Sequence, residues 1–446
     1  MAKKKSKKTR KPNLLVLMAD SLRRDHLGCY GNEWIRSPNI DRLASESVVF
    51  DEAYPETLPT LPVRNAMLSG RHCGPELGWG PMREEDVRLP EIMRKRGYTA
   101  GLVADVYHMF KPGMNFSRGF SSWQFIRGQE GDPYKSAVNP DPPVPPEYGD
   151  KHDRRMHQFS KNVAGWESEE DYFTARVYNT ATEWVEQNYR QGPFFLWVDS
   201  FDPHEPWYPP YYYADLYDPD FRGVEPIGST YGKWSTHLSP RQMQRMKALY
   251  AGEVTFLDRY IGKMLDTLEL CGIADDTLVV LISDHGHVVG DHGLIGKGWA
   301  THARHEVMDL VLMIRYPGRK HGGKRVKALC YNIDVLPTVF GALGMKTPKQ
   351  FEGIDMTGLV TRKKKAIRDC VTCSYHTPDN MIVKTLKWTL LLDKDHRPEM
   401  LFDRRKDPHE NRNVLKKNPA VVKRLLKLEA ADWAKRPPRT EARRFW

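Results

Sequence analysis

The chain has 446 residues, of which 40% are hydrophobic and 28% are charged, and its formal net charge is +11 at pH 7. This length exceeds what a single hydrophobic core usually fills, so we expect a large domain and a smaller one. The composition excludes a disordered, collagen-like or disulfide-dense chain, and the six scattered cysteines favour a cytoplasmic protein.

The positive charge is concentrated in the two tails of the chain. Residues 3–11 hold seven basic and no acidic residues, and residues 416–446 hold ten basic and three acidic ones. We expect a disordered basic tail at residues 1–11 and a second basic tail at residues 437–446, with no specific nucleic-acid partner. Because no stretch approaches the roughly 20 apolar residues of a membrane-spanning helix, we expect no membrane span.

Four apolar runs predict the strands of a buried, mostly parallel sheet. They occupy residues 14–19, 98–104, 194–198 and 278–282, they do not alternate with polar residues, and helical segments separate them. Ligands of open α/β sheets bind beyond the carboxyl ends of the strands. We therefore expect the side chains that follow these strands to converge: Asp20, Asp105, His108, Asp199, Asp202, His204, Asp284 and His285.

Helical periodicity predicts helices over residues 89–96, 171–188 and 240–270, with glycines as natural stops. Residues 131–150 are rich in proline and polar residues, which predicts a long surface loop or lid. After residue 345 the chain changes character, with short strands expected from residue 370 and a closing helix from residue 419. We expect a main domain at 12–345 and a smaller sheet-plus-helix subdomain at 346–436.

Residues 57–71 contain a threonine that two prolines bracket. Pro62 suits the first position of a short helix that ends near Gly70, so the hydroxyl of Thr60 is expected at the start of that helix. Arg64 then falls in the first turn, where the helix dipole disfavours a cation unless an anion is shared there. We therefore expect an anion to bind here. The alternative is that Thr60, close to two prolines, is an ordinary turn or cap residue.

A metal site is predicted by three of the residues that follow strands. Asp20, Asp284 and His285 offer oxygen donors and one imidazole, which suit one divalent ion such as Mg, Mn, Ca or Zn. Thr60 is expected as a fourth ligand in its alkoxide form, because a cation stabilises the deprotonated oxygen. The alternative for an aspartate at a strand end is to cap the next helix.

Other candidate residues surround the predicted metal site. Residues 290–298 form a glycine-rich segment that carries Lys297, and glycines let a backbone approach an anionic ligand closely. His204 is placed to act as a general acid towards the leaving oxygen. His302 and His305 are expected either to assist the leaving group or to bind a second metal ion.

Several motifs in this order resemble the sulfatase branch of the alkaline phosphatase superfamily. They lie at residues 12–31, 37–43, 60–64, 89–98, 193–204, 283–286, 291–297 and 401–410. The resemblance implies an alkaline-phosphatase-like α/β fold, with a central mostly parallel sheet flanked by helices and a smaller C-terminal α+β subdomain. It also implies that Asp20, Asp284 and His285 bind the metal, that Thr60 is the nucleophile, and that the substrate anion or leaving oxygen contacts the remaining matched residues, Arg64, His204 and Lys297.

Three positions depart from the family pattern. Sulfatases carry at the position of Thr60 a cysteine or serine that is oxidised to formylglycine, and threonine cannot form that aldehyde, so no formylglycine is expected. Ser21 stands where sulfatases commonly carry another aspartate. Val106 replaces a sulfate-binding lysine, which leaves Tyr107 and His108 as the expected substrate-binding residues.

The departures favour phosphoryl transfer over sulfuryl transfer. We expect one divalent ion and hydrolysis of phosphate diesters or phosphonate monoesters through a phospho-Thr60 intermediate, because water readily attacks a phosphothreonine at a metal site. The alternatives are a sulfatase that acts through threonine, a two-metal phosphodiesterase that uses Asp202, His204, His302 and His305, and a non-catalytic anion-binding protein. The expected partners are a small anionic ester and further copies of the chain in a homo-oligomer.

Overall fold

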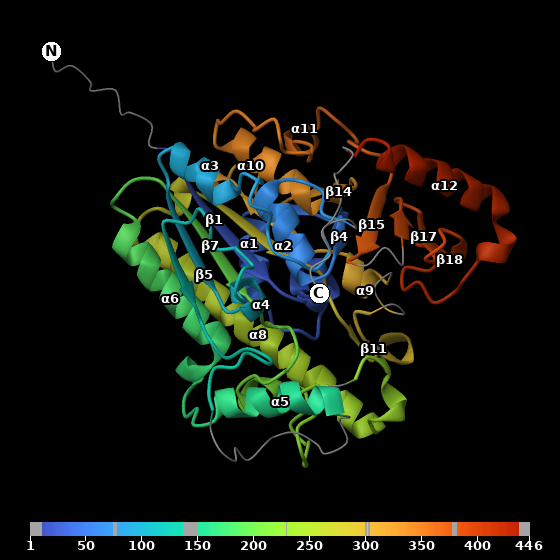
Figure 1. The fold of residues 1–446 in the computed structure, drawn as a ribbon, viewed down its shortest axis with the longest axis horizontal. Coiled ribbons are helices and arrows are strands. Elements are labelled where there is room, and N and C mark those ends of the chain that lie inside the picture. Colours follow the sequence, from blue (N-terminus) through green and yellow to red (C-terminus); the bar gives the residue numbers. More distant parts are fainter. Residues whose placement is uncertain are drawn as a thin grey trace.

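The structure is a computed structural model that describes residues 11–74, 78–136, 150–228, 230–298, 301, 304–376 and 381–436 (Figure 1). The predicted C-terminal tail lies outside these residues, as do the N-terminal tail up to residue 10 and most of the predicted loop at 131–150.

The main sheet has eight strands among the described residues. Their order across the sheet is β13 (Lys324–Val326), β2 (Val48–Phe50), β12 (Leu312–Arg315), β9 (Thr277–Ser283), β1 (Asn13–Ala19), β7 (Phe194–Ser200), β5 (Thr99–Ala104) and β6 (Ser122–Phe125). The four predicted strands are confirmed as neighbours, and they pair in parallel. Only β12 runs antiparallel to its neighbours within this sheet, so the sheet is mostly parallel, as the sequence predicts.

The register of the central strands explains why their polar side chains meet. Ala19 at the end of β1 lies opposite both Ser200 of β7 and Ser283 of β9. The three strands therefore end level with one another. The residues that follow β1 and β9, Asp20 and Asp284, leave the sheet at the same edge.

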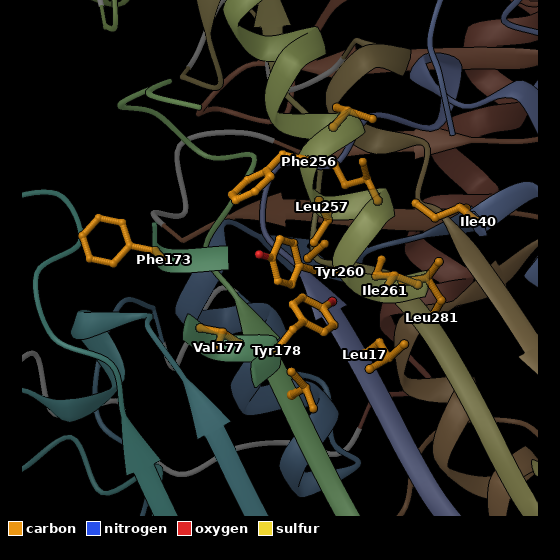
Figure 2. Packing of buried hydrophobic residues seen from close by; sticks show 14 of the residues in the cluster. Leu17, Ile40, Phe173, Val177, Tyr178, Phe256, Leu257, Tyr260, Ile261 and Leu281 are labelled. Atoms are coloured by element: carbon orange, nitrogen blue, oxygen red, sulfur yellow. The ribbon is translucent and has the colours of Figure 1, made fainter. Parts of the chain in front are cut away.

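Helices cover both faces of the main sheet (Figure 1). Alternate residues of a strand point to opposite faces, so Leu15 and Leu17 pack in one core cluster while Leu14 and Val16 pack in the other. One cluster includes α1 (Pro38–Ser45), α6 (Phe173–Asn188) and the long α8 (Pro240–Leu270); Figure 2 shows residues of α6 and α8 packed over β1 and β9. The other includes α2 (Thr60–Ser69), α3 (Leu89–Lys95), α4 (Tyr107–Phe110), α10 (Val335–Ala342) and α11 (Thr357–Val360).

A second sheet forms the C-terminal part, and α12 (Pro419–Trp433) packs on it, to the right in Figure 1. Its order is β18 (Pro398–Asp403), β17 (Trp388–Leu392), β16 (Met381–Lys384), β15 (Val371–Tyr375) and β4 (Thr57–Leu58). The last strand comes from the N-terminal part of the chain and pairs in parallel with β15. The helix that carries Thr60 thus begins directly after a strand of the C-terminal sheet.

Short elements complete the described structure. A small sheet has the order β10 (Val288–Val289), β11 (Leu294–Gly296) and β8 (Gly232–Lys233), and β14 (Cys330–Tyr331) pairs with β3 (Ala53–Tyr54). The remaining helices are α5 (Asp150–Val163), α7 (Tyr211–Ala214) and α9 (His305–Met308). Within the part of the chain that the structure describes, no helix has the length and apolar character needed to cross a membrane.

Candidate active site

The predicted metal ligands meet at the carboxyl edge of the main sheet. Asp20 follows β1, whereas Asp284 and His285 follow β9, and all three side chains are fully buried. One possible ligand atom from each lies within 4.8 Å of the others, and no other group of three such residues gathers this closely within the described ranges. The structure therefore brings the predicted set together.

The hydrogen bonds of these residues fit a bound cation. The Nδ1–H of His285 donates to the carbonyl of Gly286 at 2.8 Å, which leaves the lone pair on Nε2. That Nε2 lies 3.5 Å from Oδ2 of Asp284 and 3.7 Å from Oδ1 of Asp20. Oδ2 of Asp20 accepts no hydrogen bond from the described residues, although Nη1 of Arg64 lies 3.2 Å from it. Electron-pair donors that face one another in a buried site are stabilised by a positive charge between them.

Burial disfavours the protonated, positively charged form of His285. Desolvation, together with the nearby charge of Lys297, lowers the pKa of His285 to about 3. The imidazole is therefore neutral near pH 7, which is the form that binds metal ions. Two carboxylates and a neutral imidazole suit a divalent ion such as Mn, Zn, Ca or Mg.

Thr60 lies beside this set as the first residue of α2. Its side chain is buried, and its Oγ1 lies 3.5 Å from Nε2 of His285. The backbone φ of Thr60 is +26°, which is rare for a β-branched residue and often marks functional sites. The hydroxyl thus lies where the sequence predicts a nucleophile.

Arg64 binds protein carboxylates in this structure, and its expected contact with a substrate anion stays a prediction. Its Nε and Nη2 donate to the two oxygens of Asp199 at 3.0 and 2.7 Å, and Nη1 donates to Oδ2 of Asp284 at 2.7 Å. Nη1 also donates to the carbonyl of Thr60 at 3.1 Å and lies 3.2 Å from Oδ2 of Asp20. The anions that offset the helix dipole come from the protein, so Arg64 fixes the ligand set and Thr60 relative to each other.

Lys297 and Ser21 lie on another side of Asp20. The ammonium group of Lys297 donates to Oγ of Ser21 at 3.3 Å and lies 4.0 Å from Oδ1 of Asp20. Ser21 in turn donates its hydroxyl to Asp20 at 2.9 Å and its backbone N–H to Oδ1 of Asp284 at 3.0 Å. Ser21 therefore orients the two carboxylates instead of adding a third.

Ring contacts connect His204 with the predicted substrate-binding residue His108, because both rings contact Phe201. The ring of His204 stacks on Phe201, with the centroids 4.0 Å apart. Tyr107 and His108 begin α4, and Nε2 of His108 lies 3.0 Å from a carboxylate oxygen of Glu130. The ring of His108 also lies 5.1 Å from that of Trp79.

Two further histidines were predicted near the site, His302 and His305. His302 lies outside the described residues. His305 starts α9, where its Nε2 lies 3.0 Å from Glu306 and its ring lies 5.6 Å from that of His409. His305 also donates its backbone N–H to Glu410 at 3.0 Å, so it lies at the junction with the C-terminal sheet. The expectation that it assists the leaving group stays a prediction.

Some residues of the site were not assigned to it from the sequence. Asp199 was noted at a strand end, but its role as the main partner of Arg64 depends on packing. Glu205 and His287 each lie one or two residues from a predicted residue, and their carboxylate and imidazole meet at 3.3 Å. Their only sequence signal is this proximity to His204 and His285.

Comparisons with known proteins match most of the chain. A family model described as "Sulfatase" matches residues 12–345, and one described as "N-sulphoglucosamine sulphohydrolase, C-terminal" matches residues 290–432. An arylsulfatase of Clostridium perfringens (strain 13 / Type A) is 26% identical over 445 residues, with 91% of this chain and 90% of that protein covered. The multifunctional alkaline phosphatase superfamily protein PehA of Trinickia caryophylli is 23% identical, with 91% of each chain covered.

The fold is also similar to solved structures. The crystal structure of the phosphonate monoester hydrolase of Agrobacterium radiobacter superposes with a TM-score of 0.75 at 20% identity, over 94% of this chain and 96% of that one. The predicted alkaline-phosphatase-like α/β fold is therefore confirmed.

Proposed function

The chain belongs to the sulfatase family and is a hydrolase of sulfuric or phosphoric esters, and on this premise we propose that it cleaves phosphate diesters or phosphonate monoesters through a covalent phospho-Thr60 intermediate. The observation that carries the proposal is the buried hydroxyl of Thr60, 3.5 Å from Nε2 of His285, beside a group that could hold a divalent ion. A threonine cannot be oxidised to an aldehyde, so its oxygen is the available nucleophile.

Asp20, Asp284 and His285 would hold the divalent ion. Such an ion supplies positive charge, which favours ionisation of a nearby hydroxyl and neutralises charge on the reacting ester. The Nδ1–H bond of His285 to Gly286 keeps Nε2 turned towards the two carboxylates. Arg64 holds Asp284 and the carbonyl of Thr60 in place, and so fixes the start of α2 against the ligand set.

In the first step the ionised oxygen of Thr60 attacks phosphorus and forms the Thr60–phosphorus bond. The bond from phosphorus to the leaving oxygen breaks, its electron pair stays on that oxygen, and protonated His204 donates a proton to it. Lys297 lies on the side of Ser21 and Asp20, where its charge stabilises the non-bridging oxygens.

In the second step water cleaves the phosphothreonine. His204, now neutral, accepts a proton from the water as the new phosphorus–oxygen bond forms and the Thr60 oxygen leaves. The site returns to its starting state. A phosphothreonine is suited to this hydrolysis, whereas a sulfothreonine would need a second displacement at sulfur.

Activity towards paired substrates tests the proposal. The purified protein, supplied in turn with Mn, Zn, Ca and Mg, is assayed with bis(4-nitrophenyl) phosphate, 4-nitrophenyl phenylphosphonate and 4-nitrophenyl sulfate. We expect the highest kcat/KM for a phosphorus ester, and we expect a chelator to remove that activity. A clear preference for the sulfate would overturn the choice of substrate.

The role of Thr60 is tested separately. We expect Thr60→Ala to lose nearly all turnover, whereas Thr60→Ser keeps a hydroxyl and retains part of it. Intact-protein mass spectrometry of wild type quenched during turnover is expected to show a phosphoryl adduct that Thr60→Ala lacks. Equal turnover by Thr60→Ala and wild type would exclude the covalent mechanism.

A sulfatase is the second candidate, and the names of the curated relatives favour it. The Clostridium perfringens relative is named an arylsulfatase, and a Bacteroides thetaiotaomicron relative is named an N-acetylglucosamine-6-O-sulfatase. The same residues would act on a sulfuric ester, with the Thr60 oxygen attacking sulfur. The sulfate arm of the substrate assay distinguishes this candidate.

A further inference from the structure

One buried carboxylate gathers the polar groups beside the general acid. Oε2 of Glu205 lies 3.3 Å from Nδ1 of His204, 3.3 Å from Nδ1 of His287 and 4.0 Å from the ammonium group of Lys297. Oε1 of Glu205 accepts a hydrogen bond from the hydroxyl of Tyr231. The side chain of Glu205 is buried, so water screens these interactions little.

The backbone of Glu205 also orients His204. The Nδ1–H of His204 donates to the carbonyl oxygen of Glu205, in addition to facing its carboxylate. This leaves Nε2 as the nitrogen that can exchange a proton with a substrate. Stacking on Phe201 fixes the plane of the ring. A single residue therefore determines both the tautomer of His204 and the charge next to it.

From this arrangement we propose that Glu205 is a positioning residue that holds Nδ1 of His204 and places a negative charge beside the ring, so that Nε2 can give a proton to the leaving oxygen. The inference deepens the proposed function and depends on it for the role of His204. In the bond-breaking step, the proton on Nε2 of His204 moves to the leaving oxygen as that oxygen takes the electron pair, and His204 becomes neutral. Glu205 stays ionised throughout and stabilises the imidazolium before the transfer.

The electrostatics of Glu205 agree with this role. Burial by itself raises the pKa of a carboxyl group, but His204, Lys297 and His287 outweigh burial and hold the pKa of Glu205 well below its usual range. Glu205 is therefore an anion at any working pH.

Other titratable groups also face this pair. The groups that act electrostatically on His204 or Glu205 from neighbouring elements are His108, Glu130, Arg155, Asp202, Tyr231, His285, His287, Lys297 and Tyr375. Of the carboxylates in this set, Glu130 is engaged by His108 and Arg155, and Asp202 by Gln129 and Thr174. Glu205 alone is in direct contact with Nδ1 of His204 among the described carboxylates.

A leaving-group comparison separates this role from a structural one. A general acid matters most when the alcohol is a poor leaving group. The test therefore compares an alkyl ester with a 4-nitrophenyl ester, both of the ester class (phosphate, phosphonate or sulfate) that wild type hydrolyses fastest. For Glu205→Gln, which keeps the shape of the side chain and an acceptor for Tyr231, we expect kcat/KM to fall about 100-fold for the alkyl ester. For the 4-nitrophenyl ester we expect a fall several times smaller.

The pH profile provides the second readout. We expect the alkaline limb of kcat/KM to move to lower pH in Glu205→Gln, because a neutral amide no longer stabilises the imidazolium. Tyr231→Phe, which removes the hydroxyl that fixes Oε1, is expected to change both readouts in the same direction but less. In NMR of histidine ring signals, which needs no turnover, we expect His204 to lose its proton at lower pH in Glu205→Gln.

Glu253→Gln is the control for placing an amide at a buried glutamate. Burial raises the pKa of Glu253 well above its usual range, so this variant tests the amide and not the lost charge. Glu253 is a buried glutamate outside the site, with Oε1 bound to the N–H of Tyr208 and Oε2 without a partner among the described residues. We expect this variant to change neither the leaving-group dependence nor the pH profile. Equal losses on both esters in Glu205→Gln, or an unmoved alkaline limb, would overturn the inference. Because the esters can be sulfates or phosphates, the inference is tested even if the proposed substrate class is wrong.

Discussion

At the scale of single residues, the charges around Arg64 favour a cation at the site. Three fully buried carboxylates, those of Asp20, Asp199 and Asp284, contact a single guanidinium group. Lys297 lies 4.0 Å from Asp20, but its ammonium group is equally close to Glu205. The buried carboxylates therefore outnumber the cations beside them, and burying an unpaired charge is costly. A divalent ion at Asp20, Asp284 and His285 would offset this excess.

Replacing Arg64 is therefore expected to destabilise the fold as well as impair catalysis. Arg64→Met leaves three carboxylates facing one another, and removing one partner of a buried ion pair typically costs about 3–5 kcal/mol. Urea unfolding in the presence of a chelator measures this loss. As a control, Arg42→Met breaks an exposed pair with Asp266, for which we expect at most about 1 kcal/mol. Equal losses in the two variants would contradict the structural role of Arg64.

His287 makes stability depend on pH in a predictable direction. Burial lowers its pKa from 6.5 to about 3, against the opposing effect of Glu205. Between these values the unfolded chain binds a proton that the native state does not bind. The stability that His287 contributes is thus present above the unfolded pKa and is lost as the pH falls towards the folded one.

The measurement compares wild type with His287→Asn by urea unfolding at pH 7 and pH 5. We expect wild type to lose about 2 kcal/mol more than the variant between these conditions. Other titrating groups contribute to both proteins and cancel in the difference. Parallel losses would show that His287 does not carry this dependence.

At the scale of elements, the site depends on how α2 and β9 are joined to their neighbours. β4 ends two residues before Thr60 and is held by β15, whose Tyr375 lies opposite Leu58. On the other side, Gly286 follows His285 and donates its N–H to Val307 of α9 at 2.9 Å. Thr60 and His285 are therefore positioned by elements that belong to different parts of the chain.

Gly286 lies where the segment after β9 contacts α9, and this contact leaves no room for a side chain. A Cβ there would lie 1.9 Å from the carbonyl oxygen of Glu306, a backbone atom that cannot move without α9. We expect Gly286→Ala to lower kcat/KM by at least about 100-fold by displacing His285, and to lower the melting temperature. Gly228→Ala is the control, because its Cβ would meet only Met156 at 3.4 Å. Wild-type activity in Gly286→Ala would contradict this account.

At the scale of the whole molecule, the C-terminal sheet includes β4, a strand from the N-terminal part of the chain. The predicted boundary after residue 345 divides the strands β15 to β18 from β4, although these strands form one sheet. Further polar contacts join the two parts: Arg368 pairs with buried Asp334, and the hydroxyl of Tyr331 donates to Asp432 at 3.0 Å. The smaller part therefore supports the start of α2, and its role goes beyond covering a surface.

Truncation tests this dependence. A chain of residues 1–345 would expose the edge of β4 and leave Asp334 buried without Arg368. We expect it to be inactive and to lack a cooperative thermal transition by circular dichroism, while the full chain shows one. An active, cooperatively folded truncated chain would mean that the first 345 residues are sufficient for the site. Light scattering of the full chain tests the proposed homo-oligomer in the same preparation.

Much of the fold followed from local patterns in the sequence. The central strands β1, β5, β7 and β9 were predictable because buried parallel strands are continuous apolar runs, and α8 because its periodicity persists over many turns. The gathering of Asp20, Asp284 and His285 was predictable because these residues directly follow two of these strands, and parallel strands end at one edge of a sheet. These inferences need only neighbouring residues and a general rule of topology.

Only the tertiary structure decided which distant groups share a contact. Arg64 contacts Asp199, which lies 135 residues away in the sequence. Glu205, which follows β7, contacts His287, which follows β9. β4 pairs with β15, whose residues lie more than 300 positions later in the chain. The charge pattern of a helix start predicted an anion for Arg64, but packing determined that the anion is a carboxylate of the protein. Sequence specifies which chemical groups are present and which local elements carry them, whereas their partners depend on how those elements pack.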